Sequence, residues 1–339
     1  MKARPNVEKQ IDERLFDQVQ KLLEEKGRET SECARKHMLE ISKGVRSPEV
    51  RKALNYFAKY YWSDLARPTL MFTACEAVGG NSKKVASIAV PIMLIAAGID
   101  IHDDIIDQSK VKNDRLTVFG RFGRDVALLV GDSLIFGGLV QLYHSLRKVP
   151  AQKAAKTIKV IENLFFELGD AEAYELQLRA KTNVSLRQYL QLVKRKAADV
   201  EAYTYIGALL GGGTKKEITA LRKYGRILGI LAILRDDLMD MRDEEELLHR
   251  LQKEVVPLPI LYAMEKGGTR DKICQIIAKK KKTKEDARKI TELTTNYNGF
   301  ERSKEIISKL IAEGLSVIKT IQHKVENLRL MIYAMGDIL

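Results

Sequence analysis

Apolar residues recur along most of this chain at the three- and four-residue spacing of amphipathic helices. In the first such segment, residues 7–45, the apolar face carries Ile11, Leu15, Val19, Leu22 and Leu23. The same spacing predicts helices over residues 49–61, 91–107, 127–146, 158–178, 186–210, 218–240 and 244–252. We also expect a short apolar helix between Pro68 and the Gly79–Gly80 pair, weaker helices after Pro259, and a polar loop over residues 108–115.

Prolines are few, and their positions support long helices. The chain holds seven, and none falls within residues 92–149 or 151–256. Proline costs about 3 kcal/mol inside a helix, so its absence over such lengths permits unbroken ones. The same stretches lack the regularly spaced Asn-Gly or Asp-Gly turns that a sandwich or barrel needs. We therefore expect an all-α protein, with a single helical domain over residues 1–339.

Basic residues outnumber acidic ones, and the formal net charge is +13. Such a charge suits nucleic acid, an anionic membrane surface or a polyanionic substrate, and it also suits a lysine-rich surface with no special partner. The densest basic run, residues 279–284, has no interleaved aromatic residue and leads into Glu285 and Asp286. This is typical of a solvated loop, so we expect no nucleic-acid partner.

The cysteines and the apolar runs indicate a cytoplasmic protein. Cys33, Cys75 and Cys274 are odd in number and far apart, which argues against a disulfide framework or a zinc site and fits a reducing compartment. The first residues, MKARPNVEKQIDERL, are too charged for a signal peptide. The longest apolar run, residues 85–99, is shorter than the roughly 20 residues of a bilayer span, so no transmembrane segment is expected.

Two segments share one pattern of aspartates, Asp-Asp-x-x-Asp, and each follows a strongly apolar stretch. The first contains Asp103, Asp104 and Asp107, and the second contains Asp236, Asp237 and Asp240. On a helix, residues i and i+4 lie one above the other, so each motif places two carboxylates on one face. Like charges at this spacing repel, and after so apolar a lead-in they destabilise the helix unless a cation compensates them.

Carboxylate oxygens are hard ligands that suit Mg²⁺, which takes a few carboxylates and keeps water or substrate phosphates in its remaining positions. One such motif alone is typical of a solvated acidic helix end. Two with the same spacing, each after a strongly apolar segment, predict that they face each other as a polycarboxylate rim around an apolar cavity. This arrangement suits a substrate with an apolar tail and a diphosphate head.

On these motifs the chain resembles the trans-isoprenyl diphosphate synthase, or polyprenyl synthetase, family over about residues 60–264. Further matches are Arg67–Pro68, the segment Gly120 to Leu134, Lys196 between the two motifs, and the segment Tyr224 to Gly229. The resemblance implies the isoprenoid synthase fold, a single large bundle of long helices around a deep apolar pocket, usually assembled as a homodimer.

The resemblance also implies a prenyltransferase that acts on an allylic prenyl diphosphate. Mg²⁺ ions on the six motif aspartates would hold the diphosphate and stabilise the departing pyrophosphate, with Asp103, Asp107 and Asp236 as catalytic residues. The C–O bond would ionise to an allylic cation, which a nucleophilic alkene captures. Lys196 matches the family lysine that contacts the diphosphate, and Lys253 corresponds to a later one. A lipid product implies peripheral contact with a membrane.

The chain departs from the family at the second site, which binds isopentenyl diphosphate. The family's basic stretch reads SDLARP here, so Arg67 is kept but Asp64 stands where a lysine is expected. The arginine pair after the first motif is replaced by Lys112 and Asn113, with Arg115 nearby. An aspartate facing a diphosphate is repulsive. The resemblance therefore implies an intact allylic site, with Arg67, Lys112 and Arg115 as remaining substrate-binding residues, and leaves the acceptor open.

Small residues just before the first motif bear on chain length. In the family, bulky side chains four and five positions before the first aspartate block long substrates. Here those positions are Ile99 and Gly98, and Ala97 and Ala96 come before them. Ala96 aligns with a histidine of the family. We expect a deep pocket for a prenyl chain of about C20 or longer. On this assignment, Gly98→Phe should shorten the accepted chain.

Four other interpretations remain open. A class I terpene synthase-like enzyme on the same fold would cyclise or quench the cation, and a non-catalytic subunit would serve an active partner synthase. A phosphohydrolase built on His102 and Asp103 needs an upstream histidine, for which His37 is the candidate, and it leaves the second motif unexplained. A di-iron bundle needs two Glu-x-x-His elements, and only Glu246 to His249 provides one.

Overall fold

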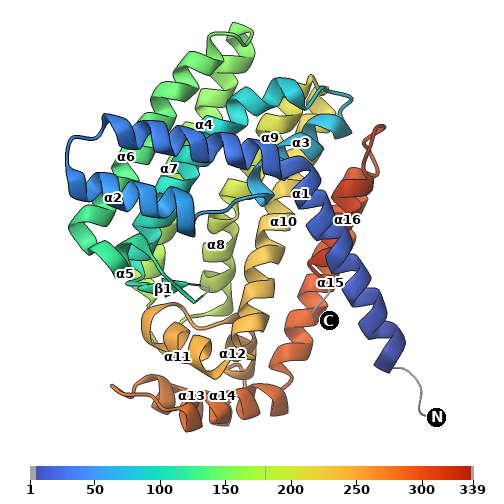
Figure 1. Cartoon of the computed structure of the whole chain (residues 1–339). Helices are drawn as coiled ribbons and strands as arrows, with labels where there is room; N and C mark the ends of the chain where they lie inside the picture. Colours follow the sequence, from blue (N-terminus) through green and yellow to red (C-terminus); the bar gives the residue numbers. More distant parts are fainter. Residues whose placement is uncertain (1–4, 113, 180, 337–339) are drawn as a thin grey trace. The chain divides into compact units, whose positions relative to one another are not determined.

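The computed structural model describes residues 5–112, 114–179 and 181–336, with residues 5–14 in their backbone only. This part of the chain is almost wholly helical (Figure 1), which confirms the all-α prediction. The helices are α1 (Pro5–Gly44), α2 (Pro48–Tyr56), the π-helix η1 (Phe57–Tyr61), α3 (Ala66–Ala77), α4 (Lys83–Ile106), α5 (Val118–Phe122), α6 (Arg124–Leu146), α7 (Ala151–Leu178), α8 (Leu186–Lys196), α9 (Ala198–Gly211), α10 (Lys215–Asp240), α11 (Glu244–Lys253), α12 (Leu258–Ala263), α13 (Gly267–Ile277), α14 (Lys284–Asn296), α15 (Gly299–Ile318) and α16 (Glu326–Ala334).

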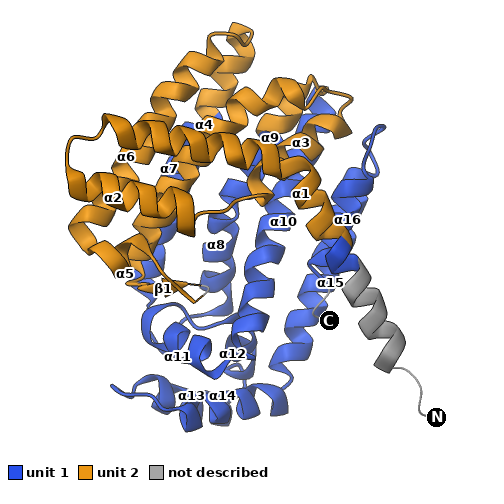
Figure 2. Ribbon diagram, viewed as in Figure 1, with its two compact units in different colours: residues 1–17, 160–205, 215–339 blue, residues 18–159, 206–214 orange. Residues whose placement is uncertain are grey.

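The chain's contacts divide it into two compact units, coloured separately in Figure 2. Unit 1 comprises residues 1–17, 160–205 and 215–339, and unit 2 comprises residues 18–159 and 206–214. Helices α1, α7 and α9 each contribute residues to both units. The single domain expected over residues 1–339 stays a prediction.

Helix α4 is the apolar centre of unit 2. Its residues from Ile88 to Gly98 are all buried, and the helix begins at Lys83 rather than at Pro91, where the sequence predicted its start. Pro91 removes one helical hydrogen bond, but the burial of apolar residues on both sides of it outweighs that loss. The helix thereby reaches 24 residues and delivers the first aspartate motif at its C-terminal end.

Helices α4 and α6 approach each other closely through glycines. A Cβ atom added to Gly98 would lie 2.6 Å from the carbonyl oxygen of Gly131 and 2.7 Å from Cγ1 of Ile135. A Cβ atom added to Gly131 would meet the ring of His102 and would lie 3.0 Å from the carbonyl oxygen of Gly98. These contacts leave room for hydrogen alone, so the two glycines fix how closely the helices pack.

In unit 1 the segment Tyr224 to Gly229 sets the packing of α10. The hydroxyl of Tyr224 donates to the carbonyl oxygen of Leu328 at 2.7 Å. The guanidinium of Arg226 forms ion pairs with Glu167 and Glu201, which come from α7 and α9. The segment that carries part of the family resemblance therefore joins several helices of unit 1.

Three local predictions needed correction. The expected loop at residues 108–115 contains a strand, because β1 (Val111–Lys112) pairs antiparallel with β2 (Arg115–Leu116). Strands of two residues are too short to show an alternating pattern. The expected helix 186–210 divides at Ala197 into α8 and α9, and the expected helix 49–61 ends as the π-helix η1.

By length and composition, α4 and α6 are each apolar enough to cross a membrane. The apolar window of α4 is 72% buried inside the protein, as in the core helix of a soluble protein, whereas that of α6 is 33% buried. The three cysteines are free thiols.

Candidate active site

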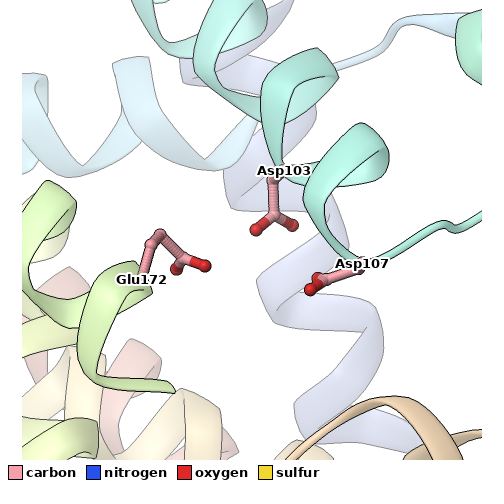
Figure 3. A group of neighbouring side chains, drawn as sticks. All are labelled: Asp103, Asp107 and Glu172. Carbon is pink, nitrogen blue, oxygen red and sulfur yellow. The ribbon is translucent and has the colours of Figure 1, made fainter. Parts of the chain in front are cut away.

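The first aspartate motif closes helix α4. Asp103 lies in its last turn and Asp107 directly follows its end, and the two carboxylates project from neighbouring positions (Figure 3). One oxygen of Asp103 and one of Asp107 lie within 4.8 Å of each other. The helical spacing that the sequence predicted is thus present, and the pair offers two hard oxygen ligands to one small cation.

Asp104, between them, faces the protein. It is buried and forms an ion pair with Lys112, whose Nζ lies 2.7 Å from Oδ1 of Asp104 and 3.6 Å from Oδ2 of Asp103. Burial raises the pKa of Asp104 to about 6, although Lys112 lowers it in part. Burial alone would lower the pKa of Lys112, but the two aspartates raise it. Lys112, predicted to bind substrate, is therefore a fixed cation of the first motif.

Two other predicted substrate-binding residues also lie in unit 2. The guanidinium of Arg67 forms ion pairs with Asp64 and with Asp100. Arg115 donates from Nη1 to the carbonyl oxygen of Tyr60 at 2.9 Å. Together with Asp103, Asp104 and Lys112, these side chains line one cavity of about 520 Å³.

The predicted pocket-floor residues differ in their surroundings. Gly98 is buried against α6, where no larger side chain fits, and Ile99 is half-buried. A Gly98→Phe variant would therefore disturb the packing of α4 on α6 whatever it did to chain length. The role of Gly98 and Ile99 in chain length stays a prediction.

The second motif ends α10 in unit 1, and its middle aspartate is a structural centre. Asp237 is 1% exposed and accepts hydrogen bonds from the hydroxyl of Tyr189, from Nη2 of Arg250 at 2.5 Å and from the backbone N–H of Leu258 at 2.9 Å. These donors use both of its carboxylate oxygens. Asp237 thus joins α8, α10, α11 and α12, and it would have to give up these bonds to bind a metal.

The outer aspartates of the second motif are more open. Asp240 accepts a hydrogen bond from Nη1 of Arg250 at 2.8 Å. Part of the Asp236 side chain is exposed, yet the surrounding protein, together with the charge of Asp240, raises its pKa to about 6. A carboxylate whose charge is disfavoured in this way gains most from a bound cation.

Sequence reasoning missed Arg250, the cation on which the second motif depends. Its guanidinium forms ion pairs with Asp237, Asp240 and Glu254. Arg250 stands in the charged segment Glu244 to Lys253, where an arginine is typical of a solvated surface. Its position four residues before Glu254 was the only local signal.

Glu254 gives a pH-dependent prediction. Burial alone would raise its pKa, but the contact with His249 and the charge of Arg250 lower it from 4.5 to about 2. The ionised carboxylate therefore stabilises the fold above about pH 4.5, and this contribution is lost as pH falls from 4.5 towards 2. We expect Glu254→Gln to lower the free energy of unfolding at pH 7 by about 1–3 kcal/mol.

Urea denaturation followed by circular dichroism at pH 7 and at low pH measures this effect. The difference between Glu254→Gln and the unaltered chain should shrink as the pH falls. Glu245→Gln is the control, because Glu245 forms an exposed pair with Lys284 and should change stability little at either pH. An equal loss at both pH values would show that the charge of Glu254 is not the cause.

The two predicted diphosphate-binding lysines lie in unit 1. Lys196, the last residue of α8, forms ion pairs with Glu172 and Glu175 on α7. Lys253, the last residue of α11, is half-buried. The role of Lys196 and Lys253 in substrate binding stays a prediction.

Comparison with known proteins agrees with the fold. Residues 48–294 match the model of the polyprenyl synthetase family. The chain is 28% identical over 276 residues to the geranylgeranyl diphosphate synthase of Methanosarcina mazei, covering 80% of this chain and 83% of that protein. It is 30% identical over 249 residues to the chloroplastic geranylgeranyl pyrophosphate synthase 3 of Arabidopsis thaliana, covering 69% of this chain and 68% of that protein. The crystal structure of geranylgeranyl pyrophosphate synthetase from Pyrococcus horikoshii superimposes with a TM-score of 0.81 at 22% identity, over 94% and 99% of the two chains.

Proposed function

Because the chain belongs to the polyprenyl synthetase family and is a prenyltransferase, we propose that it ionises a long allylic prenyl diphosphate, of about C20 or longer, with Mg²⁺ held by its two aspartate motifs. The single observation that carries this proposal is the pair Asp103 and Asp107 at the end of the apolar helix α4. One oxygen of Asp103 lies within 4.8 Å of one oxygen of Asp107, and such a pair of carboxylates is compensated best by a divalent cation.

Within each motif we propose a division of roles. Asp103 and Asp107 in unit 2, and Asp236 and Asp240 in unit 1, hold the metal. Asp104 and Asp237 are bound by Lys112 and Arg250, and they position the motifs. Bound Mg²⁺ would supply the positive charge that stabilises the departing pyrophosphate. We further propose that Lys196 and Lys253 bind the diphosphate and that the enzyme works in the cytoplasm.

Incubation with farnesyl, geranylgeranyl and geranylfarnesyl diphosphates tests this function. Release of pyrophosphate that requires Mg²⁺ and favours the longer substrates is the expected result. The products, extracted after incubation with and without isopentenyl diphosphate, identify the acceptor, and a hydrocarbon or alcohol made from one substrate would indicate the terpene synthase-like alternative. Absence of Mg²⁺-dependent pyrophosphate release from every substrate would contradict the proposal.

We propose a homodimer formed through one face of α6. Leu129, Phe136, Val140 and Tyr143 are large, exposed and spaced by seven, four and three residues, so they share one helical face. This apolar stripe runs along four turns of α6. An exposed apolar face of this length can pack against the same face of a second copy of the helix. Contact of the same face with a membrane surface is the alternative outcome.

Light scattering during size-exclusion chromatography should therefore report twice the chain mass of 38.4 kDa. The double variant Phe136→Glu with Val140→Glu should report the single mass, because it buries charge in the proposed interface. The control is Tyr333→Glu, since Tyr333 is also exposed but lies on α16 in unit 1. A dimer that persists in the double variant would refute this interface.

A further inference from the structure

Unit 2 contains a cavity of about 520 Å³ with an aromatic wall and a charged end. Phe57, Tyr61 and Trp62, from η1 and the residue after it, form the wall, and Asp64, Arg67 and Asp100 lie at the charged end. Trp62 is 6% exposed, and its ring N–H has no hydrogen-bond partner among the residues that the structure describes. Trp62 is also the single tryptophan of the chain.

The guanidinium of Arg67 is held between two carboxylates of the protein. Its Nη1 and Nη2 donate to the two oxygens of Asp100 at 3.0 and 2.8 Å, and Nη1 also donates to Oδ2 of Asp64 at 3.1 Å. The other oxygen of Asp64 accepts from the backbone N–H of Arg67 at 3.1 Å. Two carboxylates thus surround one guanidinium, and the Asp64 side chain is only 7% exposed. This end of the cavity carries net negative charge.

The remaining cations of the lining have protein partners too. Lys112 pairs with Asp104, and Arg115 donates to the carbonyl oxygen of Tyr60. The charged side chains that line the cavity are the acids Asp64, Asp100, Asp103 and Asp104 and the bases Arg67, Lys112 and Arg115. At the charged end, apart from the proposed metal ligand Asp103, the two acids Asp64 and Asp100 face the single base Arg67, which is unfavourable for an anionic ligand.

A diphosphate entering at Arg67 would have to displace Asp64 and Asp100. The buried carboxylate of Asp64 would then lose its partner and would face the phosphate oxygens. Breaking a buried ion pair by removing one partner is strongly unfavourable, because an uncompensated charge remains. A head group that donates hydrogen bonds meets no such obstacle, since both carboxylates keep Arg67 and can accept further donors.

We propose that this cavity binds a phosphate-free ligand whose head group, an ammonium or a hydroxyl, donates hydrogen bonds to Asp64 and Asp100. The aromatic wall suits the short apolar body of such a ligand, and aromatic faces also attract an ammonium. The cavity alone supports this binding, and only the role of the ligand as prenyl acceptor rests on the function proposed above. In that role an alkene carbon of the ligand would bond to the prenyl carbon as the C–O bond to pyrophosphate breaks, and the ligand would lose one proton. Asp64 and Asp100 are then the residues that determine specificity for the acceptor.

Three probes with one hydrocarbon body separate the possibilities: 3-methyl-3-buten-1-amine, which is an ammonium at pH 7, 3-methyl-3-buten-1-ol, and isopentenyl diphosphate. Fluorescence of Trp62 reports occupancy of the cavity without any turnover. We expect the amine and the alcohol to saturate the signal at concentrations at least about tenfold below that of the diphosphate. Tighter binding of the diphosphate than of either neutral or cationic probe overturns the proposal.

Two variants and a control make the test specific. Asp64→Lys should reverse the order, so that the diphosphate binds at least about tenfold tighter than it does to the unaltered chain. Asp100→Asn, at a more exposed position, should weaken binding of the amine. This variant keeps the test available if Asp64→Lys fails to fold. Asp125→Asn, at an exposed site outside the cavity, should leave all three affinities unchanged. Equal effects of Asp100→Asn and Asp125→Asn would refute the assignment. Because no turnover is involved, absence of pyrophosphate release would contradict the proposed function and leave this result intact.

Discussion

Replacing Asp103 with alanine should slow pyrophosphate release from an allylic diphosphate by about 10²–10³-fold. The substitution removes one of two carboxylates whose oxygens lie within 4.8 Å at the end of α4, and a divalent cation then loses a charged ligand. Asp107→Ala should have a similar effect. Single-turnover release of pyrophosphate measures both, because product release then does not limit the rate.

Two further measurements separate metal binding from a loss of structure. Asp125→Ala, on an exposed aspartate in the first turn of α6, should keep the rate of the unaltered chain. Raising the Mg²⁺ concentration should partly restore the rate of Asp107→Asn, because a weakened metal site can still be filled by mass action. A rate in Asp103→Ala close to that of Asp125→Ala would overturn the metal-binding role of the first motif.

Gly131→Val should destabilise the fold by about 2–4 kcal/mol, enough to lower the midpoint of thermal unfolding by several degrees. Any Cβ atom at Gly131 meets the His102 ring and lies 3.0 Å from the carbonyl oxygen of Gly98. The backbone cannot give way there without separating α4 from α6. The same variant should lose catalytic activity, since His102 directly precedes Asp103.

Gly169→Ala is the matched control for this effect. A Cβ atom at Gly169, on an exposed position of α7, would meet nothing within 4 Å. Alanine should therefore stabilise the helix there by up to about 1 kcal/mol. Differential scanning calorimetry compares the two variants directly. Similar melting temperatures for Gly131→Val and the unaltered chain would show that α4 and α6 can separate without cost.

The sequence predicts a feature of this fold well when the feature depends on the spacing of residues within one helix. The position of Asp103 beside Asp107 follows from helical spacing alone, so the sequence was sufficient to predict that pair. The apolar run before it indicates a buried helix that starts at Pro91, whereas the helix begins at Lys83. Tertiary burial decided otherwise, and burial by distant segments is not visible in a local pattern.

The partners of the charged groups were beyond prediction for the same reason. Arg250 contacts Asp237 across 13 residues, and Arg67 contacts Asp100 across 33. Such contacts depend on how helices are placed, and a charged residue on an amphipathic helix has many possible partners. Asp64 was recognised only as a departure from the family pattern. Its ion pair with Arg67 shows how that departure is accommodated in the fold.

Unit 2 consists of two separate stretches of the chain, and this affects when it can fold during synthesis. Residues 206–214 complete this unit, and there Gly207 packs against the backbone of Met71, and Gly211 against that of Cys75. During synthesis these residues leave the ribosome only after the whole of residues 160–205 has emerged, so unit 2 cannot reach its final packing as an early folding domain. A fragment that ends at residue 159 would expose that uncovered surface to aggregation or chaperones.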